Sequence, residues 1–174
     1  MPIYALGDRV PKIDPSAFVH PDATVIGNVT IGPESTIWPQ AVLRGDYGSI
    51  TVGARTSIQD GSVIHTTDRY PTVIGDDCVI GHLVHMECCT IEDRALVGSG
   101  SVVLHRVIVR TGAVVGANAV VPNDMEVPSR AMALGVPAKL RLDAVTDPDA
   151  TIGRGARNYV RNGAVYRAEL RRID

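Results

Sequence analysis

The chain has 174 residues, a formal net charge of −2 and only 4% aromatic residues, and this length favours a single domain. The small net charge and the lack of a basic stripe exclude nucleic acid and an anionic membrane surface as expected partners. No signal peptide or apolar run of about twenty residues is recognisable, and the three cysteines lack zinc-site spacing, so we expect a cytoplasmic protein with reduced thiols.

Residues 1–15 are expected to form an extended lead-in, because Pro2, Pro11 and Pro15 disfavour a helix. From about residue 16 to residue 122, aliphatic side chains recur about every six positions. The recurring residues are Val19, Val25, Ile31, Ile37, Leu43, Val52, Ile58, Ile64, Ile74, Ile80, Met86, Ile91, Val97, Val103, Val109, Val115 and Val121. Such a repeat predicts a parallel β-helix, in which each repeat supplies one short strand and a corner. Residues 1–140 are therefore predicted to form an all-β domain with one aliphatic residue per repeat in its interior.

Two longer intervals interrupt the repeat. The intervals after Leu43 and after Ile64 exceed six residues by three and by four, which predicts loops at residues 46–48 and 66–70. After Val121 the pattern ends.

The tail, residues 141–174, contains apolar residues at helical spacing. They are Ile152, Ala156, Tyr159, Val160, Tyr166, Leu170 and Ile173. This spacing predicts an α-helix, with Asp147 and Pro148 as its cap and first turn. Because glycines within the segment lower its intrinsic helix propensity, we expect the helix to be stabilised by docking.

Three repeats form one coil of a triangular β-helix, so residues three repeats apart stack about 4.8 Å above one another. The residues that follow three stacked core positions are predicted to form one outward column of Arg44, His65 and Glu87. On the preceding face, Asp60 and His82 are predicted to stack in the same way. Arginine, histidine and glutamate in one column are unusual for a simple solvated surface.

His65 and Glu87 are predicted to share a metal ion, because they stack on adjacent coils. His82 lies beyond a corner, so a neighbouring copy of the chain would have to supply it. A three-fold arrangement would build three equivalent sites between subunits. His85 is an alternate ligand. The competing interpretation is that these histidines only form structural hydrogen bonds.

Three segments resemble the gamma-class carbonic anhydrase family: Arg44-Gly45-Asp46, Thr56-Ser57-Ile58-Gln59-Asp60-Gly61-Ser62-Val63-Ile64-His65, and Ile80-Gly81-His82. The resemblance implies a homotrimer of left-handed parallel β-helices, each with a C-terminal α-helix, and zinc sites between subunits. It implies zinc ligation by His65 and His82 and an intersubunit ion pair between Arg44 and Asp46.

The same resemblance implies that Gln59 orients the metal-activated water and that Asp60 supports the network of Arg44 and Asp46. Tyr159 would reach the site from the tail; its alternative role is that of a packed helix anchor.

The third histidine ligand of the family falls on Glu87 in this chain. Two histidines and a glutamate form an accepted zinc set and also suit iron. The carboxylate removes one unit of positive charge from the site, so it should weaken activation of bound water, whose pKa must approach about 7. We therefore expect a retained metal site, with zinc or alternatively iron or cobalt, and weak hydration of CO2 to bicarbonate.

Two alternatives remain open. A non-enzymatic trimer could retain the metal-binding or assembly role without turnover. A hexapeptide acyltransferase would share the β-helix and the exit segment at residues 135–139, with His65, His82 or His85 as its catalytic histidine.

Overall fold

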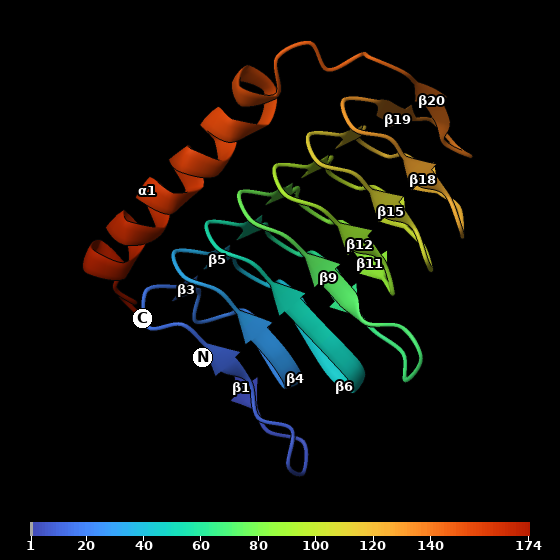
Figure 1. Cartoon of the computed structure of the whole chain (residues 1–174). Coiled ribbons are helices and arrows are strands. Elements are labelled where there is room, and N and C mark those ends of the chain that lie inside the picture. Colours follow the sequence, from blue (N-terminus) through green and yellow to red (C-terminus); the bar gives the residue numbers. More distant parts are fainter. Residues whose placement is uncertain (1) are drawn as a thin grey trace.

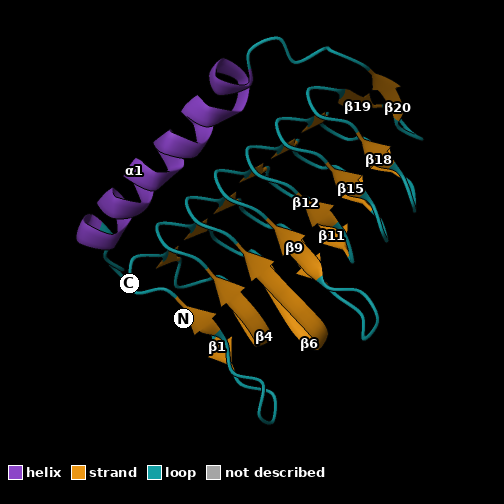
Figure 2. Cartoon of the chain, in the orientation of Figure 1, coloured by secondary structure: helices purple, strands orange, loops and turns teal. Residues whose placement is uncertain are grey.

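The computed structural model describes residues 2–174. The chain winds into a parallel β-helix with three faces and ends in one α-helix that runs along the stack of coils (Figure 1). Strands and corners alternate along the whole stack, and one long helix lies alongside them (Figure 2). The predicted fold class, a left-handed parallel β-helix followed by a C-terminal α-helix, is confirmed.

The strands are divided among the three faces. Two long strands bend around a corner and belong to two faces, β4 (Thr24–Ile31) and β6 (Val42–Val52). The first face continues from their first halves with β8 (Val63–His65), β11 (His85–Glu87), β14 (Val102–Val103) and β17 (Val120–Val121). The second face continues from their second halves with β9 (Thr72–Ile74), β12 (Thr90–Ile91), β15 (Ile108–Val109) and β18 (Glu126–Val127). The third face consists of β3 (Phe18–Val19), β5 (Thr36–Ile37), β7 (Ser57–Ile58), β10 (Val79–Ile80), β13 (Leu96–Val97), β16 (Val114–Val115), β19 (Met132–Leu134) and β20 (Lys139–Arg141).

The predicted vertical register is confirmed. On the first face Ile64 pairs with Leu43 of the coil below and with Met86 of the coil above. All three side chains are 0% exposed. The interior is a column of such residues, and burial of each aliphatic side chain stabilises the fold by about 1.5–3 kcal/mol.

The lead-in and the last coils extend the prism beyond the predicted limits. β1 (Ile3–Tyr4) and β2 (Lys12–Ile13) pair in parallel with β4, so part of the lead-in belongs to the first coil. At the other end, Val127 and Ala133 continue the six-residue spacing after Val121 and are 0% exposed. The predicted end of the repeat at Val121 was wrong, because Pro122 occupies an ordinary corner rather than a terminus.

The two predicted loops have different outcomes. Residues 66–71 form an irregular loop between β8 and β9, which confirms the second prediction. The first prediction is confirmed in part. Residues 46–48 are assigned to the strand β6 rather than to a loop, but the extra residues do bulge, since Gly27 of β4 pairs with Gly45 and Val29 with Ile50. The extra residues are absorbed by this irregular stretch of strand.

The tail also differs from a simple exit. Residues 135–139 turn the chain back, so that β20 pairs antiparallel with β19. A short π-helical segment, η1 (Asp149–Gly153), then leads into α1 (Arg154–Glu169). The Asp147 carboxylate accepts a hydrogen bond of 3.0 Å from the Ala150 amide, as expected for a residue at a helix start.

The helix docks on the β-helix, as predicted, and it covers the third face. Ile152 and Ala156 are buried and belong to one apolar cluster with Val79 and Val114 of that face. The helix ends at Glu169, so the predicted stripe does not extend to Ile173, which is 87% exposed. The division of the chain at residue 140 remains a prediction. In residues 2–174, no helix is both long and apolar enough to cross a membrane.

Candidate metal centre

The predicted outward column lies at the end of the first face. Arg44, His65 and Glu87 occupy neighbouring strands, since Arg44 pairs with His65 and His65 with Glu87. Gly45 allows this arrangement, because a Cβ atom at this position would lie 2.6 Å from the carbonyl oxygen of Asn28. The close approach of β4 therefore excludes a side chain between Arg44 and Asp46.

His65 lies between two carboxylates. Its Nδ1 atom is 2.8 Å from Glu87 Oε1, and its Nε2 atom is 2.9 Å from Asp46 Oδ1. Asp46 also forms an ion pair with Arg44 within the same chain. Burial raises the pKa of Asp46, but hydrogen bonds from His65 and Arg44 outweigh it and leave this pKa below its ordinary value.

Glu87 contacts further histidines. The distance from its Oε2 atom is 3.4 Å to His105 Nε2 and 3.9 Å to His85 Nε2. Burial acts to raise the pKa of Glu87, whereas hydrogen bonds with His65 and His105 lower it, and the lowering prevails. Glu87 is therefore an anion surrounded by imidazoles.

His105 was missed by the sequence reasoning. It follows β14, which lies directly above β11, because Met86 pairs with Val103. If the column of Arg44, His65 and Glu87 is extended by one coil, the end of β14 lies above Glu87, close to His105. The imidazole reaches Glu87 from the corner that follows the strand, and the repeat does not specify the direction of a corner side chain.

His82 lies apart from this cluster. It follows β10 on the third face, and its Nδ1 atom is 2.8 Å from Asp60 Oδ2. Within residues 2–174, the one group of three potential ligands whose donor atoms all lie within 4.8 Å of one another is Glu87, Cys88 and His105. A single chain thus does not assemble His65, His82 and Glu87, and their shared role as ligands remains a prediction.

The other predicted site residues are distributed around His82. Gln59 is 4% exposed, and its backbone amide donates to the Ile80 carbonyl. Asp60 binds His82, and among residues 2–174 no hydrogen bond or ion pair joins it to Arg44 or Asp46. The predicted support of Asp46 by Asp60 is therefore not formed within one chain.

Tyr159 connects α1 to this side of the molecule. The centroid of its ring lies 5.8 Å from that of the Trp38 ring. This contact fits the alternative role, in which Tyr159 anchors the helix by packing. Burial raises the pKa of Tyr159, and the negative charge of Asp60 raises it further. Tyr159 is therefore near Asp60 and His82 rather than near the cluster of His65 and Glu87.

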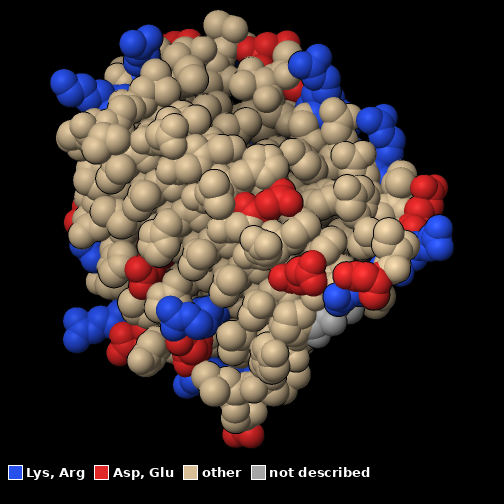
Figure 3. All heavy atoms as spheres, turned by 180° about the vertical axis from the view of Figure 1, so that it is seen from behind, with Lys and Arg blue, Asp and Glu red and all other residues tan. Residues whose placement is uncertain are grey.

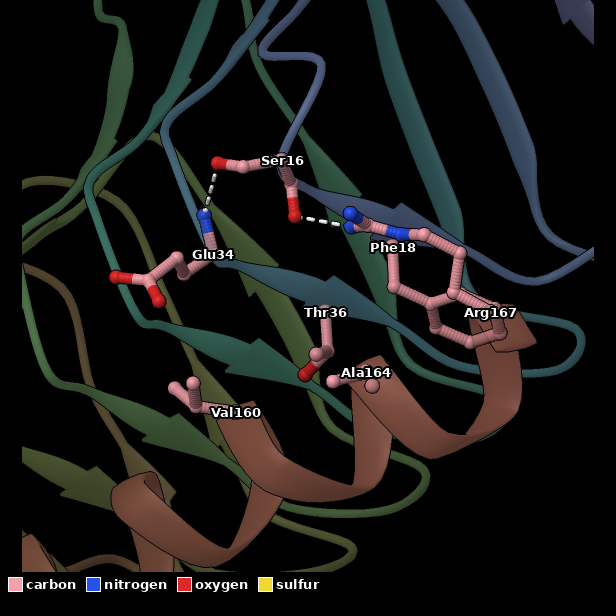
Figure 4. Close-up of a pocket in the computed structure, with 8 residues that line it drawn as sticks. Ser16, Phe18, Glu34, Thr36, Val160, Ala164 and Arg167 are labelled. Carbon is pink, nitrogen blue, oxygen red and sulfur yellow. Dashed lines mark hydrogen bonds between the residues drawn. The ribbon is translucent and has the colours of Figure 1, made fainter. Parts of the chain in front are cut away.

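A pocket beneath the helix does not contain these residues. Figure 4 shows that it opens between α1 and strands β3 and β5, where Arg167 donates a hydrogen bond to the Ser16 carbonyl. The Ser16 hydroxyl accepts from the Glu34 amide at 2.9 Å. The pocket has a volume of about 130 Å³, and its polar groups already bind one another. Its location on the third face separates it from the column of His65 and Glu87.

The donor atoms at the end of the first face fit a divalent metal. An imidazole and a carboxylate of adjacent coils touch each other, and zinc accepts both ligand types. A histidine that binds a metal commonly donates its other ring N–H to a carboxylate, and Asp46 is placed to accept it.

Comparisons with known proteins agree with this architecture. The family described as "Bacterial transferase hexapeptide (six repeats)" matches residues 11–45 and 71–105, and "Hexapeptide repeat of succinyl-transferase" matches residues 89–122. A solved structure described as a hexapeptide transferase family protein from Anaplasma phagocytophilum is 33% identical, with a TM-score of 0.90, and the match covers 95% of this chain and 98% of that one.

Two relatives carry a more specific description. Gamma carbonic anhydrase 2, mitochondrial, of Arabidopsis thaliana is 37% identical over 93% of this chain, which spans 60% of that relative. Carbonic anhydrase of Geobacillus kaustophilus is 36% identical over 95% of this chain and 91% of its own length. With the parallel β-helix, the hexapeptide repeats and the C-terminal helix, these identities show that the chain belongs to the gamma carbonic anhydrase family.

Proposed function

We propose that the protein is a homotrimeric metalloprotein that hydrates CO2 to bicarbonate with weak activity, at metal sites built between subunits. The observation that carries the proposal is the contact of 2.8 Å between His65 and Glu87, two potential ligands on adjacent coils. His82 lies on another face, so a second subunit has to supply the third ligand.

His65 and Glu87 of one subunit and His82 of a second subunit would hold the ion. Zinc, when bound to such a set, supplies a Lewis acid that lowers the pKa of water. Asp46 holds the ring of His65, and Arg44 in turn holds Asp46 through their ion pair. Gln59 would orient the reacting water and CO2. Because Glu87 brings a negative charge, activation of water should be weaker than at a site of three neutral imidazoles.

The molecular surface supports association of subunits. Figure 3 shows a broad face on which most Lys and Arg lie near the rim and only a few Asp and Glu interrupt the uncharged surface. Val63 of the first face is 37% exposed, and Leu83, beside His82, is 70% exposed. Exposed aliphatic residues next to the proposed ligands are expected where a subunit interface surrounds the site.

The decisive experiment compares the wild type with His82→Ala. Sedimentation velocity would give the oligomeric state, elemental analysis the metal content per chain, and stopped-flow measurement the rate of CO2 hydration after loading with zinc, iron or cobalt. We expect a trimer whose metal content and hydration rate both fall in His82→Ala. A monomeric wild type, or an unchanged metal content in the variant, would overturn the proposal.

Two further outcomes separate the alternatives. A trimer that binds metal but does not hydrate CO2 would identify a metal-binding or assembly role. The hexapeptide transferase family protein of similar structure makes an acyltransferase the second candidate. Binding of acetyl-CoA, measured by calorimetry, would favour that candidate, because such a transferase takes its acyl group from acyl-CoA. The set of Arg44, Gln59 and Asp60 argues against it, since these residues have no evident purpose in acyl transfer.

A further inference from the structure

The corner between β11 and β12 contains a cysteine that is buried outside the hydrophobic core. Cys88 has a φ of +53° and is 2% exposed, yet it is not part of the aliphatic interior, to which its neighbour Cys89 belongs. Other corner residues of this β-helix, such as Asp77 and Leu83, share this left-handed backbone, so the conformation marks a corner. The thiol of Cys88 is therefore buried outside the β-helix core, directly after Glu87.

The loop at residues 66–71 covers this thiol. The Thr67 amide donates to Cys88 Sγ at 3.2 Å, and the Thr67 hydroxyl oxygen lies 3.3 Å from the same sulfur. The Arg106 guanidinium lies over the Tyr70 ring, with its Cζ atom 5.4 Å from the ring centroid, and this contact holds the loop against the corner. The Thr67 amide therefore holds the Cys88 sulfur beneath the loop.

The backbone of Cys88 is also held from two sides. Its amide donates to Thr72 Oγ1 at 2.8 Å, and its carbonyl accepts from the Arg106 amide at 2.7 Å. The sulfur thus has a defined position at the corner, and a ligand that is held in position loses little freedom on binding.

Glu87 directs its two carboxylate oxygens to different imidazoles. Oε1 faces His65 at 2.8 Å, and Oε2 faces His105 at 3.4 Å. The donor atoms of Glu87, Cys88 and His105 all lie within 4.8 Å of one another. Glu87 Oε2, which faces His105, can therefore belong to a second group of ligands. Glu87 Oε1 remains with His65.

We propose that Glu87, Cys88 and His105 of one chain form a binding site for a thiophilic divalent cation, with zinc as the expected ion. A thiolate, an imidazole and a carboxylate are all zinc ligands, and the thiolate selects against magnesium and calcium. On binding, the Cys88 thiol releases its proton to solvent and the sulfur ligates the ion. The carboxylate and the thiolate together balance the double positive charge of the ion.

This site goes beyond the proposed function, because it requires neither a second subunit nor His82. The two sites share Glu87, which would bridge them through one oxygen each when both are filled. The intrasubunit site should therefore persist in a variant that removes the ligand supplied across the interface.

The test uses cobalt as the probe in the full-length protein with His82→Ala. We expect bound cobalt at one ion per chain by elemental analysis, together with a thiolate-to-cobalt charge-transfer band in the near ultraviolet. Cys88→Ser in the same background should remove the band and weaken cobalt affinity by at least about tenfold, the loss that removal of even an outer-shell partner causes. His105→Gln should weaken the affinity similarly and retain some charge transfer from Cys88.

His20→Gln is the matched control, since His20 lies after β3 on the third face and should leave cobalt binding unchanged. Circular dichroism would establish that every variant is folded. Absence of cobalt from His82→Ala, or a charge-transfer band that survives Cys88→Ser, would overturn the intrasubunit site. The intersubunit proposal fails on a different result, an equal metal content in the wild type and His82→Ala.

Discussion

The third face and the end of the first face show how one repeat supports two different surfaces. Both faces place aliphatic residues such as Ile58 and Ile64 in the interior, where each is 0% exposed. On the third face the outward residues Val79 and Val114 are apolar and lie under α1. At the end of the first face the outward residues are ionisable, and among residues 2–174 the helix α1 packs instead on β3, β5 and β7 of the third face. The interior residues therefore determine the winding of the β-helix, whereas the outward residues determine what each face can bind.

Substitution in the interior should have the largest effect on stability. Ile64→Ala removes a fully buried side chain beneath Met86, and it should lower the free energy of unfolding by about 2–5 kcal/mol. Urea denaturation would measure the change. His65→Ala, one residue later on the outward side, is the matched control and should change stability far less. Equal losses for both variants would contradict the separation of interior and outward roles.

Disturbance of the covered face should have a smaller effect on stability and none on metal binding. A Cβ atom at Gly163 would lie 2.6 Å from Thr36 Cγ2, so Gly163→Ala forces α1 away from β5. We expect a loss of about 1–3 kcal/mol in the free energy of unfolding. Metal content, measured by elemental analysis, should remain that of the wild type. A loss of metal would show that the two surfaces are coupled through the helix.

Replacement of the Glu87 carboxylate tests the proposed metal site at the end of the first face. Glu87→His supplies a neutral third imidazole in place of a negative ligand, so it should increase the rate of CO2 hydration by about tenfold, equivalent to about 1.4 kcal/mol. Stopped-flow measurement on the zinc-loaded protein would record the rate. The same variant should weaken the proposed intrasubunit site, because His105 and Cys88 would lose their shared carboxylate. An unchanged or lower rate would contradict the assignment of Glu87 as a metal ligand.

The smallest expected effect on stability comes from Glu92 on the second face, which forms an ion pair and lies outside the proposed metal sites. Arg110 and Thr111 donate hydrogen bonds to Glu92 and hold the pKa of its carboxyl below the ordinary value. A lowered pKa stabilises the folded chain above the unfolded pKa of about 4.3, and this stability is lost as pH falls through the lower folded value.

Glu92→Gln should therefore lower the free energy of unfolding at pH 7 by about 1 kcal/mol or less. The difference from the wild type should vanish under strongly acidic conditions, below the folded pKa. Urea unfolding across this range would measure it. A difference that stays constant as the pH falls would show that packing, rather than charge, explains the effect.

Much of the scaffold could be predicted because the repeat constrains it. A six-residue spacing determines which side chains enter the interior, and the interior determines which residues stack. The placement of Arg44, His65 and Glu87 on neighbouring strands follows from this register alone. The docking of α1 could be predicted from its apolar spacing, although its end at Glu169 could not.

The corners were much less predictable. The interval after Leu43 predicts a loop at residues 46–48, where the extra residues bulge within the strand β6, and the repeat continues through Val127 and Ala133 beyond its predicted end. The spacing of the cysteines also gave no indication of metal binding. Cys88 and His105 are brought together by stacking of corners, and two residues on stacked corners have no characteristic separation in sequence.

The amino-acid sequence by itself determined the parallel β-helix, because burial of one aliphatic residue per repeat is a periodic requirement that can be read along the chain. Only the tertiary structure decided which polar groups meet outside the core. Contacts such as that of Glu87 with His105 depend on side-chain direction at a corner and on a loop that folds over Cys88. These directions result from packing between coils, and no local periodic pattern encodes them.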